Sequence, residues 1–446
     1  MTGLMVSYAL CQSRTEPRCG PPVYCARTDW NLEPYPDTPP LLGSAGTSIT
    51  DPNFGSRIFR VSDPASDLAG RRRSFMTTAS AEQNTWNADS TEFYVHVREG
   101  QRIVYDFDPA KMRLGRAKLV KAPWQADPDF SYVRPNTLYG IRYLDPAFQE
   151  YNVKTDEITR LHKVSDCFLL QKGESANASL TVSADDQRFS TILGPQQDRN
   201  YVIYIFDRQL GCRWYNTQTG EIGGKWGPTG LISAPDRFSI HSSKMSKSGK
   251  FVWIDRGEST VGRSWLVWEV DTTKVTSCQS YCGGHLAMGY SHILGPLGDY
   301  HPLNFIIRPL NEVTKTITTT KPPALPSERY WYALHISWNH INTEDSNPAC
   351  LSTYSAYNPK SQGKALDTMA AGENEILCIE VDGKDHKVWR FAHTYSTAQG
   401  GFWSTPRGNL SQDGRFYLFT SDWENSLGIE PETRSFRTDV FLVELR

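Results

Sequence analysis

The stretch Ser411-Gln-Asp-Gly-Arg-Phe-Tyr-Leu-Phe419 joins a polar turn to a run of aromatic and apolar residues. Ser and Asp side chains bond to nearby backbone groups, and Gly tolerates a positive φ, so the first half is typical of a tight turn. The apolar run that follows is typical of a buried or half-buried β-strand. The stretch therefore predicts a turn and the next strand of an antiparallel sheet.

The same pattern occurs three more times along the chain. A polar turn followed by a strand-like run is repeated at Asn87–Val95, Ser183–Thr191 and Ser246–Ile254. One copy would be weak support for a repeat, whereas four copies are strong support. Their spacing fits six intervals of about 54 residues, the range of repeat-built architectures.

Weaker copies stand where the missing units should be. They are Arg134–Ile141, Tyr290–Phe305 and Asn339–Tyr354, which brings the number of units to seven. Each unit is expected to hold several short strands, and no long stretch has the period of an α-helix. Four short strands in each repeat of this length are typical of a propeller blade. The sequence thus predicts an all-β fold, a seven-bladed β-propeller.

The two ends of the chain indicate how the ring closes. A strand-like segment, Arg57–Ser62, stands alone before the first unit, and we expect it to complete the last blade and protect its edge. Residues 1–50 are predicted to be a Pro-rich arm, and residues 51–446 the propeller. Two separate β-sandwich domains would need a linker near the middle of the chain. None is found there, because residues 225–236 run directly into another turn.

Composition excludes several classes of protein. The 446 residues include 47 Lys plus Arg and 49 Asp plus Glu, a net charge of −2 that argues against a broad basic face for nucleic acid. No apolar run of about 18 residues occurs, so no membrane-spanning helix is expected. The sequence also lacks the GxxxxGK[ST], HExxH and GxSxG motifs, which argues against nucleotide hydrolysis, zincin proteolysis and α/β-hydrolase chemistry.

Nine cysteines indicate an oxidising compartment. Two pairs are spaced closely enough to close small disulfide loops, Cys19 with Cys25 and Cys278 with Cys282. A zinc site is the alternative, but no second pair with CxxC-like spacing completes a four-cysteine set. The cysteines therefore favour disulfides and a secreted protein, although no clear signal peptide is present.

Several segments resemble known propeller families. The turns resemble those of TolB-like and WD40-like propellers, and residues 50 to 430 resemble a family of secreted bacterial seven-bladed propellers of largely unassigned function. The resemblance implies the fold and little about activity. Propellers also include polysaccharide lyases, such as oligogalacturonate and ulvan lyases, which is a distant analogy. The segments that carry the resemblance are Asp51–Val61, Trp226–Gly230, Gly284–His292, Trp389–Thr394 and Ser411–Trp423.

The segment before each turn is expected to be the innermost strand, so its side chains would line a central funnel. Residues from different blades would converge there, and this convergence makes them candidates for a site. The candidates are Asn84, Trp86, His241, Lys244, His335, Trp338, Arg407 and Asn409.

Histidines are concentrated in one region, since six of the ten lie between residues 241 and 340. They have two chemical interpretations. In one, His285 and His292 bind a divalent metal such as Mn, Ca or Zn, with oxygen from Asn339 or Asp345. In the other, a histidine is a general base, because its pKa lies near the working pH.

These residue types fit β-elimination from a uronate. That reaction needs a neutralised carboxylate, a base for the C5 proton and an acid for the leaving oxygen. Arg407 would neutralise, His241 would be the base, and Tyr290 or His335 the acid. The remaining candidates would bind the sugar, with their tryptophans and Trp403 stacking on its faces. They are Asn84, Trp86, Lys244, Trp338 and Asn409.

The sequence therefore predicts a secreted carbohydrate-active propeller. Its most concrete form is a lyase that cleaves uronate-containing polysaccharide in a histidine-lined funnel. Two alternatives remain open: a non-catalytic propeller that binds a glycan or a protein, and an extracellular self-assembling structural protein. The expected partner is a polysaccharide or oligosaccharide, without nucleic acid or a membrane span.

Overall fold

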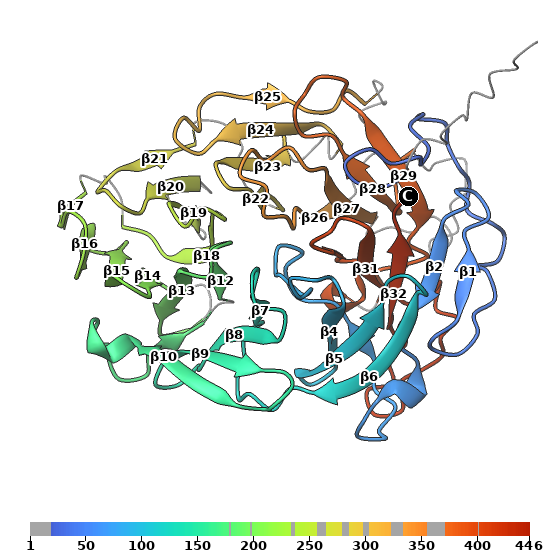
Figure 1. The fold of residues 1–446 in the computed structure, drawn as a ribbon, viewed down its shortest axis with the longest axis horizontal. Coiled ribbons are helices and arrows are strands. Elements are labelled where there is room, and N and C mark those ends of the chain that lie inside the picture. The colour runs from blue at the N-terminus through green and yellow to red at the C-terminus, as the bar shows by residue number, and fades with distance from the viewer. Residues whose placement is uncertain are drawn as a thin grey trace, which may run out of the picture.

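The structure, a computed structural model, is a ring of β-sheets around a central axis (Figure 1). It describes residues 19–177, 180–196, 199–232, 237–256, 265–278, 285–297, 303–322, 333–354, 371–399 and 401–446. Within these ranges the chain forms strands and short 3-10 turns and no α-helix. None of the helical turns described there has the length and apolar character needed to cross a bilayer.

The described strands pair into seven antiparallel sheets. The first three sheets along the chain are each built from strands that are consecutive in the sequence. One sheet contains β3 (Phe75–Met76), β4 (Glu92–Val97), β5 (Gln101–Asp108) and β6 (Arg113–Leu119). The next contains β7 (Asp129–Phe130), β8 (Thr137–Ile141), β9 (Ala147–Asn152) and β10 (Ile158–Lys163). The third contains β11 (Ser175–Ala176), β12 (Thr181–Val182), β13 (Arg188–Gly194), β14 (Val202–Asp207), β15 (Gly211–Asn216), β16 (Glu221–Gly224) and β17 (Gly230–Leu231).

Three four-stranded sheets continue the ring. The first contains β18 (Ile240–Met245), β19 (Phe251–Arg256), β20 (Trp265–Glu269) and β21 (Val275–Ser277). The second contains β22 (Ala287–Met288), β23 (His292–Pro296), β24 (Phe305–Pro309) and β25 (Ile317–Thr318). The third contains β26 (Ala333–Ser337), β27 (Ala349–Tyr354), β28 (Glu375–Ile379) and β29 (Val388–His393). Three 3-10 turns, η1 (Pro64–Ser66), η2 (Val164–Asp166) and η4 (Phe402–Ser404), lie between strands.

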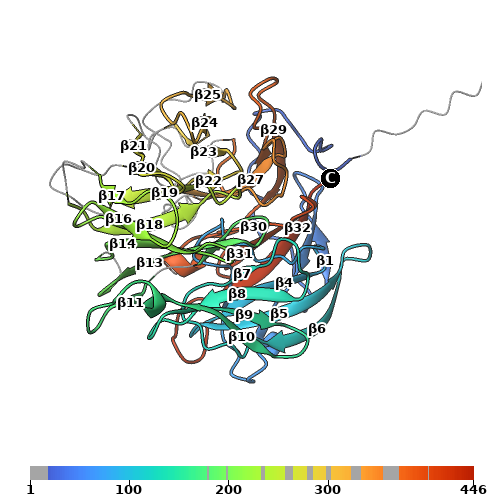
Figure 2. The same cartoon turned by 60° about the vertical axis from the view of Figure 1, so that its left-hand side comes forward.

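The closing sheet combines both ends of the chain. It contains β30 (Asn409–Leu410), β31 (Phe416–Ser421), β32 (Asp439–Glu444), β2 (Arg57–Arg60) and β1 (Ser48–Thr50). β2 pairs with β32 in antiparallel register, so the predicted closure by an N-terminal strand is confirmed. Figure 2 shows β1 and β32 on the same side of the ring. The propeller fold is confirmed, and the count of seven blades stays a prediction.

The four predicted turns share one hydrogen-bonding pattern. In each, the side chain of the first residue accepts the backbone N–H five residues later, and that bond starts the second strand of a sheet. Asn87 Oδ1 accepts from Glu92, and Ser183 Oγ accepts from Arg188. Ser246 and Ser411 accept in the same way from the first residues of β19 and β31, at 3.2 and 3.0 Å. The repeat is therefore a structural unit as well as a sequence pattern.

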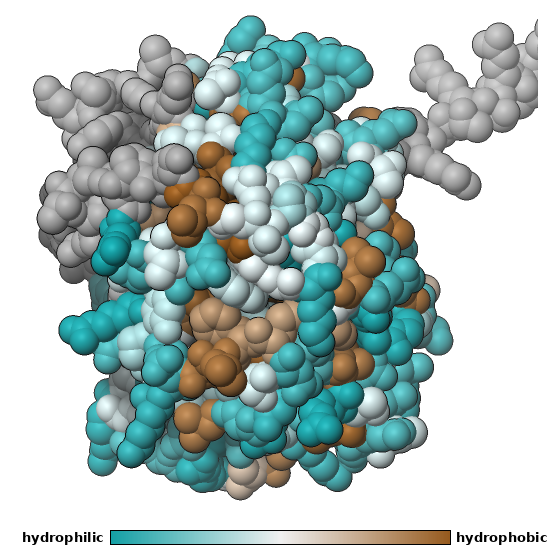
Figure 3. Space-filling view, turned by 90° about the vertical axis from the view of Figure 1, so that its left-hand side faces the viewer, coloured by the Kyte–Doolittle hydropathy of each residue, from teal (hydrophilic) through white to brown (hydrophobic). Residues whose placement is uncertain are grey.

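The core is divided among the interfaces between neighbouring sheets. Between the closing sheet and the β3–β6 sheet, Trp86 packs against Phe93, Phe107 and Phe416. Aromatic side chains bury large areas, so such interfaces provide much of the stability. On the outer surface near β16 and β17, apolar patches are interrupted by polar residues (Figure 3), as is usual for a protein surface.

The described part of the predicted arm lies against the β26–β29 sheet and the closing sheet. Arg390 of β29 donates from its backbone N–H to the oxygen of Arg27 and from its side chain to the oxygens of Asp29 and Asn31. The indole of Trp423 donates to the oxygen of Pro40. β1 falls inside the segment predicted as arm and forms the edge of the closing sheet. The division of the chain at residue 50 stays a prediction.

Three disulfides lie among the described residues. Cys19 and Cys25 are bonded, as predicted. Cys167 with Cys212 and Cys350 with Cys378 are bonded as well, and neither pair was predicted. Both join cysteines far apart in sequence that the fold brings together. Cys278 is disulfide-bonded, and its predicted partner Cys282 lies outside the described residues.

Candidate functional site

A loop between β3 and β4, residues 77–85, runs into the centre of the ring (Figure 1). We call it the axial loop. The backbone N–H of Asn84 donates to Asp129 Oδ1 at 2.7 Å, and Asn339 Nδ2 donates to Asn84 Oδ1 at 2.8 Å. Asn409 Nδ2 donates to two backbone oxygens of the loop. Three other sheets therefore hold the axial loop across the funnel.

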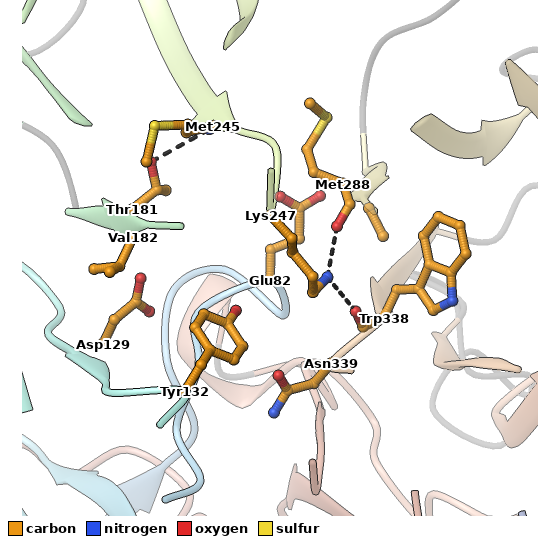
Figure 4. Close-up of a pocket in the computed structure, with 11 residues that line it drawn as sticks. Glu82, Asp129, Tyr132, Thr181, Val182, Met245, Lys247, Met288, Trp338 and Asn339 are labelled. Atoms are coloured by element: carbon orange, nitrogen blue, oxygen red, sulfur yellow. Dashed lines mark hydrogen bonds between the residues drawn. The ribbon is translucent and has the colours of Figure 1, made fainter. Parts of the chain in front are cut away.

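Beside the axial loop lies a small polar cavity of about 30 Å³, which has room for water (Figure 4). Its polar lining comes from several different sheets and from the axial loop. These side chains are Glu82, Asp129, Tyr132, Lys247 and Asn339. Burial raises the pKa of Asp129 well above its usual value.

Two lysines meet Glu82 at this point. Lys244 Nζ lies 3.0 Å from Glu82 Oε1, whereas Lys247 Nζ donates to the backbone oxygens of Met288 and Trp338. Burial raises the pKa of Glu82 to about 7, although both lysines act to lower it. Burial also lowers the pKa of Lys247 to about 8. Glu82 is therefore a buried acid that titrates near neutral pH.

A cluster of titratable side chains lies near Lys244. The His335 ring of β26 packs edge to face against His285, with centroids 4.0 Å apart. Tyr354 stacks on the His335 ring, and its Oη lies 3.2 Å from His335 Nε2. Burial, with smaller contributions from His285, Arg407 and Lys244, lowers the pKa of His335 well below its usual value. His335 is therefore neutral at physiological pH.

Arg407 completes this cluster. The side chain is 0% exposed, and none of its Nε, Nη1 and Nη2 atoms has a hydrogen-bond partner among the described residues. Burial lowers its pKa to about 10, so the guanidinium is still charged at neutral pH. Burying a charge without a partner costs several kcal/mol. The guanidinium of Arg407 is therefore a buried positive charge that is suited to bind an anionic ligand.

Two aromatic side chains of η4 cover the Arg407 guanidinium. The Arg407 Cζ lies 4.1 Å from the ring centroid of Phe402 and 4.6 Å from that of Trp403. The two rings are 48% and 43% exposed, so their other surfaces face solvent. Cation–π contact stabilises the covered charge in part.

Three predicted residues lie elsewhere. His241 is exposed, at a bulge near the start of β18. Tyr290 and His292 lie at the other end of β22 from His285, where both contact Asp345. The His292 Nδ1 lies 2.9 Å from Asp345 Oδ2, and the Tyr290 backbone N–H donates to Asp345 Oδ1. The structure therefore brings together His335, Arg407 and Lys244 and does not bring Tyr290 or His292 to them.

The other predicted sugar-binding residues are buried and use their polar groups within the protein. Asn84 and Asn409 bond to the backbone and side chains that fix the axial loop. The indole of Trp86 donates to the oxygen of Asn409, and that of Trp338 to the oxygen of Asn347. Their proposed contact with a sugar stays a prediction.

The predicted metal pair does not form a donor set. His285 and His292 lie at opposite ends of the β22–β23 hairpin, as the pairing of Ala287 with Leu294 requires. No group of three or more His, Cys, Asp or Glu side chains with metal-binding geometry occurs within the described ranges. The described residues therefore do not bring the predicted pair His285 and His292 together as a metal site. His301, another histidine of the predicted group, lies outside them.

Sequence reasoning missed Glu82, Tyr354 and Phe402 and gave Trp403 only a general role in stacking. Glu82 stands two residues before the predicted Asn84, which was its only signal. Tyr354 ends a predicted strand and carried no signal of its own. Phe402 and Trp403 are adjacent aromatic residues a few positions before Arg407. Such a pair could have indicated side chains that stack on the guanidinium or on a sugar.

Comparison with known proteins supports the fold. No family model and no curated protein sequence matches this chain. An oligogalacturonate lyase in complex with manganese shares 11% identity over 92% of this chain and 98% of its own, with a TM-score of 0.54. The oligogalacturonate lyase of Vibrio parahaemolyticus shares 8% identity over 91% of this chain and 98% of its own, with a TM-score of 0.51. At such identities the likeness shows a propeller fold and no more.

Proposed function

We propose that this protein is a secreted lyase that cleaves uronate-containing polysaccharide by β-elimination. The observation that carries the proposal is the buried charge of Arg407, which has no hydrogen-bond partner among the described residues and lies beside the neutral His335. A charged guanidinium is suited to bind a carboxylate in bidentate geometry. A neutral imidazole is suited to accept a proton.

The reaction then runs as an elimination with a balanced proton transfer. Arg407 neutralises the uronate carboxylate, which makes the neighbouring C5–H more acidic. His335 takes the C5 proton, and the electron pair of that bond forms the C4=C5 double bond. The C4–O4 bond breaks, and the leaving oxygen takes a proton from water, because O4 and the C5 proton of a galacturonate lie on opposite faces of the ring. His241 as base and Tyr290 as acid remain proposed alternatives.

The two structural neighbours suggest which substrates to test first. Both are named as oligogalacturonate lyases, and one is named as a manganese complex. Galacturonate oligomers are therefore the first proposed substrates, and a divalent metal such as Mn, Ca or Zn is a proposed addition. The disulfides support an oxidising compartment and hence secretion. The seven sheets support seven blades.

The test is an elimination assay on a panel of uronate polysaccharides, with and without chelator. Elimination creates an unsaturated uronate, whose ultraviolet absorbance rises with turnover. A rise that Arg407→Met abolishes would support the proposal, and a rise lost with chelator would support a metal. A flat trace for the whole panel would overturn the lyase proposal.

A second candidate function is glycan binding without catalysis. The exposed rings of Phe402 and Trp403 favour it, because aromatic side chains provide apolar area for sugar faces. Tight binding of uronate oligomers in the absence of any product would support this function. Self-association of the protein would favour the third proposal, a structural role.

A further inference from the structure

Arg407 is shielded from solvent although it is the best anion site near the funnel. Its side chain is 0% exposed, whereas Phe402 and Trp403, which cover it, are about half exposed. A carboxylate cannot reach the guanidinium past both rings as they stand. Access to Arg407 therefore depends on movement of the cover or of Arg407 itself.

The backbone beside Arg407 is held in place. Thr77 Oγ1 donates to the backbone oxygen of Arg407, and Ser352 Oγ donates to that of Pro406. Both donors are buried and belong to neighbouring sheets or the axial loop. The backbone at Pro406 and Arg407 is therefore fixed to the neighbouring parts of the protein.

The cover has mostly local support. The oxygen of Gly401 accepts bonds from the N–H and Oγ of Ser404, and the oxygen of Phe402 accepts one from Thr405 Oγ1 at 2.7 Å. A single described bond, from Ser396 Oγ to the oxygen of Ser404, ties η4 to another segment. Gly401 has a φ of 78°, and no atom crowds the position of a Cβ. A glycine with this freedom is suited to act as a hinge.

We propose that Phe402 and Trp403 form a gate over Arg407 that opens to admit the carboxylate of a uronic acid and then closes on the sugar ring. The inference rests on the proposed function and deepens it, because it assigns the contacts that select an acidic sugar. Arg407 provides the charge, and the two rings provide the apolar surface. The Phe402 ring also lies 6.5 Å from that of His335, so the gate borders the proposed base.

Accessibility of Arg407 to an arginine reagent tests the gate without any turnover. The protein is treated with phenylglyoxal, and labelling of each arginine is followed by peptide mass spectrometry. In the variant Phe402→Ala/Trp403→Ala, we expect Arg407 to be labelled about tenfold faster than in the unchanged protein. This corresponds to a free energy of local opening that is lower by about 1.4 kcal/mol. Phe436→Ala, which removes an exposed aromatic ring elsewhere, is the matched control and should leave the rate of Arg407 labelling unchanged.

Two further readouts complete the test. Arg390 is equally buried but paired with Glu375, so its labelling should stay slow in every variant. Galacturonate should slow labelling of Arg407, and the neutral sugar galactose should not. Equal labelling of Arg407 in both proteins, or equal protection by galactose, would overturn the gate.

The result also separates the gate from the lyase proposal. If Arg407 is labelled faster in the double variant and galacturonate protects it, but no elimination product forms, the gate proposal is supported and the lyase proposal is overturned. If elimination product forms but Arg407 is labelled equally fast in both proteins, the lyase proposal is supported and the gate proposal is overturned.

Discussion

The imidazole rings of His285, which precedes β22, and His335 of β26 lie edge to face, with centroids 4.0 Å apart. His335 is buried and His285 is exposed. Burial lowers the pKa of His335 most, and the positive charge that His285 can carry lowers it further. The pair thus keeps one imidazole neutral below the pH at which a histidine normally takes up a proton.

The acid limb of the pH–activity profile should depend on His285. His285→Asn removes one group that lowers the pKa of His335, so that pKa rises and activity is lost at a higher pH. The pH dependence of kcat/KM reports this limb. His292→Asn, at the far end of the hairpin, is the control and should leave it unchanged. An acid limb that His285→Asn does not move would argue against His335 as the base.

Arg407→Met should stabilise the protein while removing uronate binding. Methionine has a similar length and no charge, so the substitution removes a buried cation that has no hydrogen-bond partner in the described part of the chain. We expect the free energy of unfolding in urea to rise by about 1 kcal/mol or more. Arg390→Met should do the opposite, because it leaves Glu375 buried without its partner. A loss of stability in Arg407→Met would indicate that Arg407 has a structural role.

Glu82→Gln should change how stability depends on pH. The pKa of Glu82 is raised from 4.5 to about 7 in the folded protein, so the folded state favours the protonated acid. The stabilising contribution of Glu82 is fully present below about pH 4.5 and is lost as pH rises to about 7. The variant lacks this loss, so its stability relative to the unchanged protein should increase across that range. Urea unfolding at several pH values measures the difference, and a difference independent of pH would contradict the assignment.

Glu375→Ala should destabilise the protein and release the arm. Glu375 and Arg390 form a buried bidentate pair with N–O distances of 2.8 and 2.7 Å, and Arg390 also holds two backbone oxygens of the arm. Removing one partner of a buried pair costs about 3–5 kcal/mol. Limited proteolysis should then cut near Arg27 sooner than in the unchanged protein. Glu375→Gln, which keeps the shape, should have a smaller effect.

Removing the cross-strand disulfide should lower stability without changing the fold. Cys350 and Cys378 face each other on β27 and β28, 28 residues apart in sequence. Cys350→Ala/Cys378→Ala should cost about 2–4 kcal/mol in the free energy of unfolding, because the unfolded chain gains freedom. Far-ultraviolet circular dichroism should keep its β-sheet spectrum. An unchanged unfolding transition would show that the disulfide adds nothing to stability.

The parts of the fold that depend on local chemistry could be predicted from the sequence. Ser183 and Ser411 start strands through bonds to residues only five positions away, so the repeat is visible in a short stretch. The closing strand was predictable because it stood alone before the first unit. The disulfides between distant cysteines, such as Cys167 with Cys212, were not, because their pairing depends on how whole sheets pack.

The candidate site was predicted only in part for the same reason. Arg407 and His335 precede turns, and the topology of a propeller brings such positions together. His285 and His292 were grouped because they are close in sequence, but a hairpin carries them to opposite ends of a sheet. Glu82 meets Lys244 only because the axial loop crosses the funnel, and no local pattern reports a path of that kind.

The pairing of β2 with β32 sets the order of events during folding. Arg57–Arg60 is made before its partner Asp439–Glu444, and the strands of six other sheets come between them, so the earlier strand has an open edge while those sheets are made. Contacts this far apart in sequence form slowly. The ring is therefore most open to mispairing with other chains just before it closes, and yield on expression will depend on how that single edge is protected.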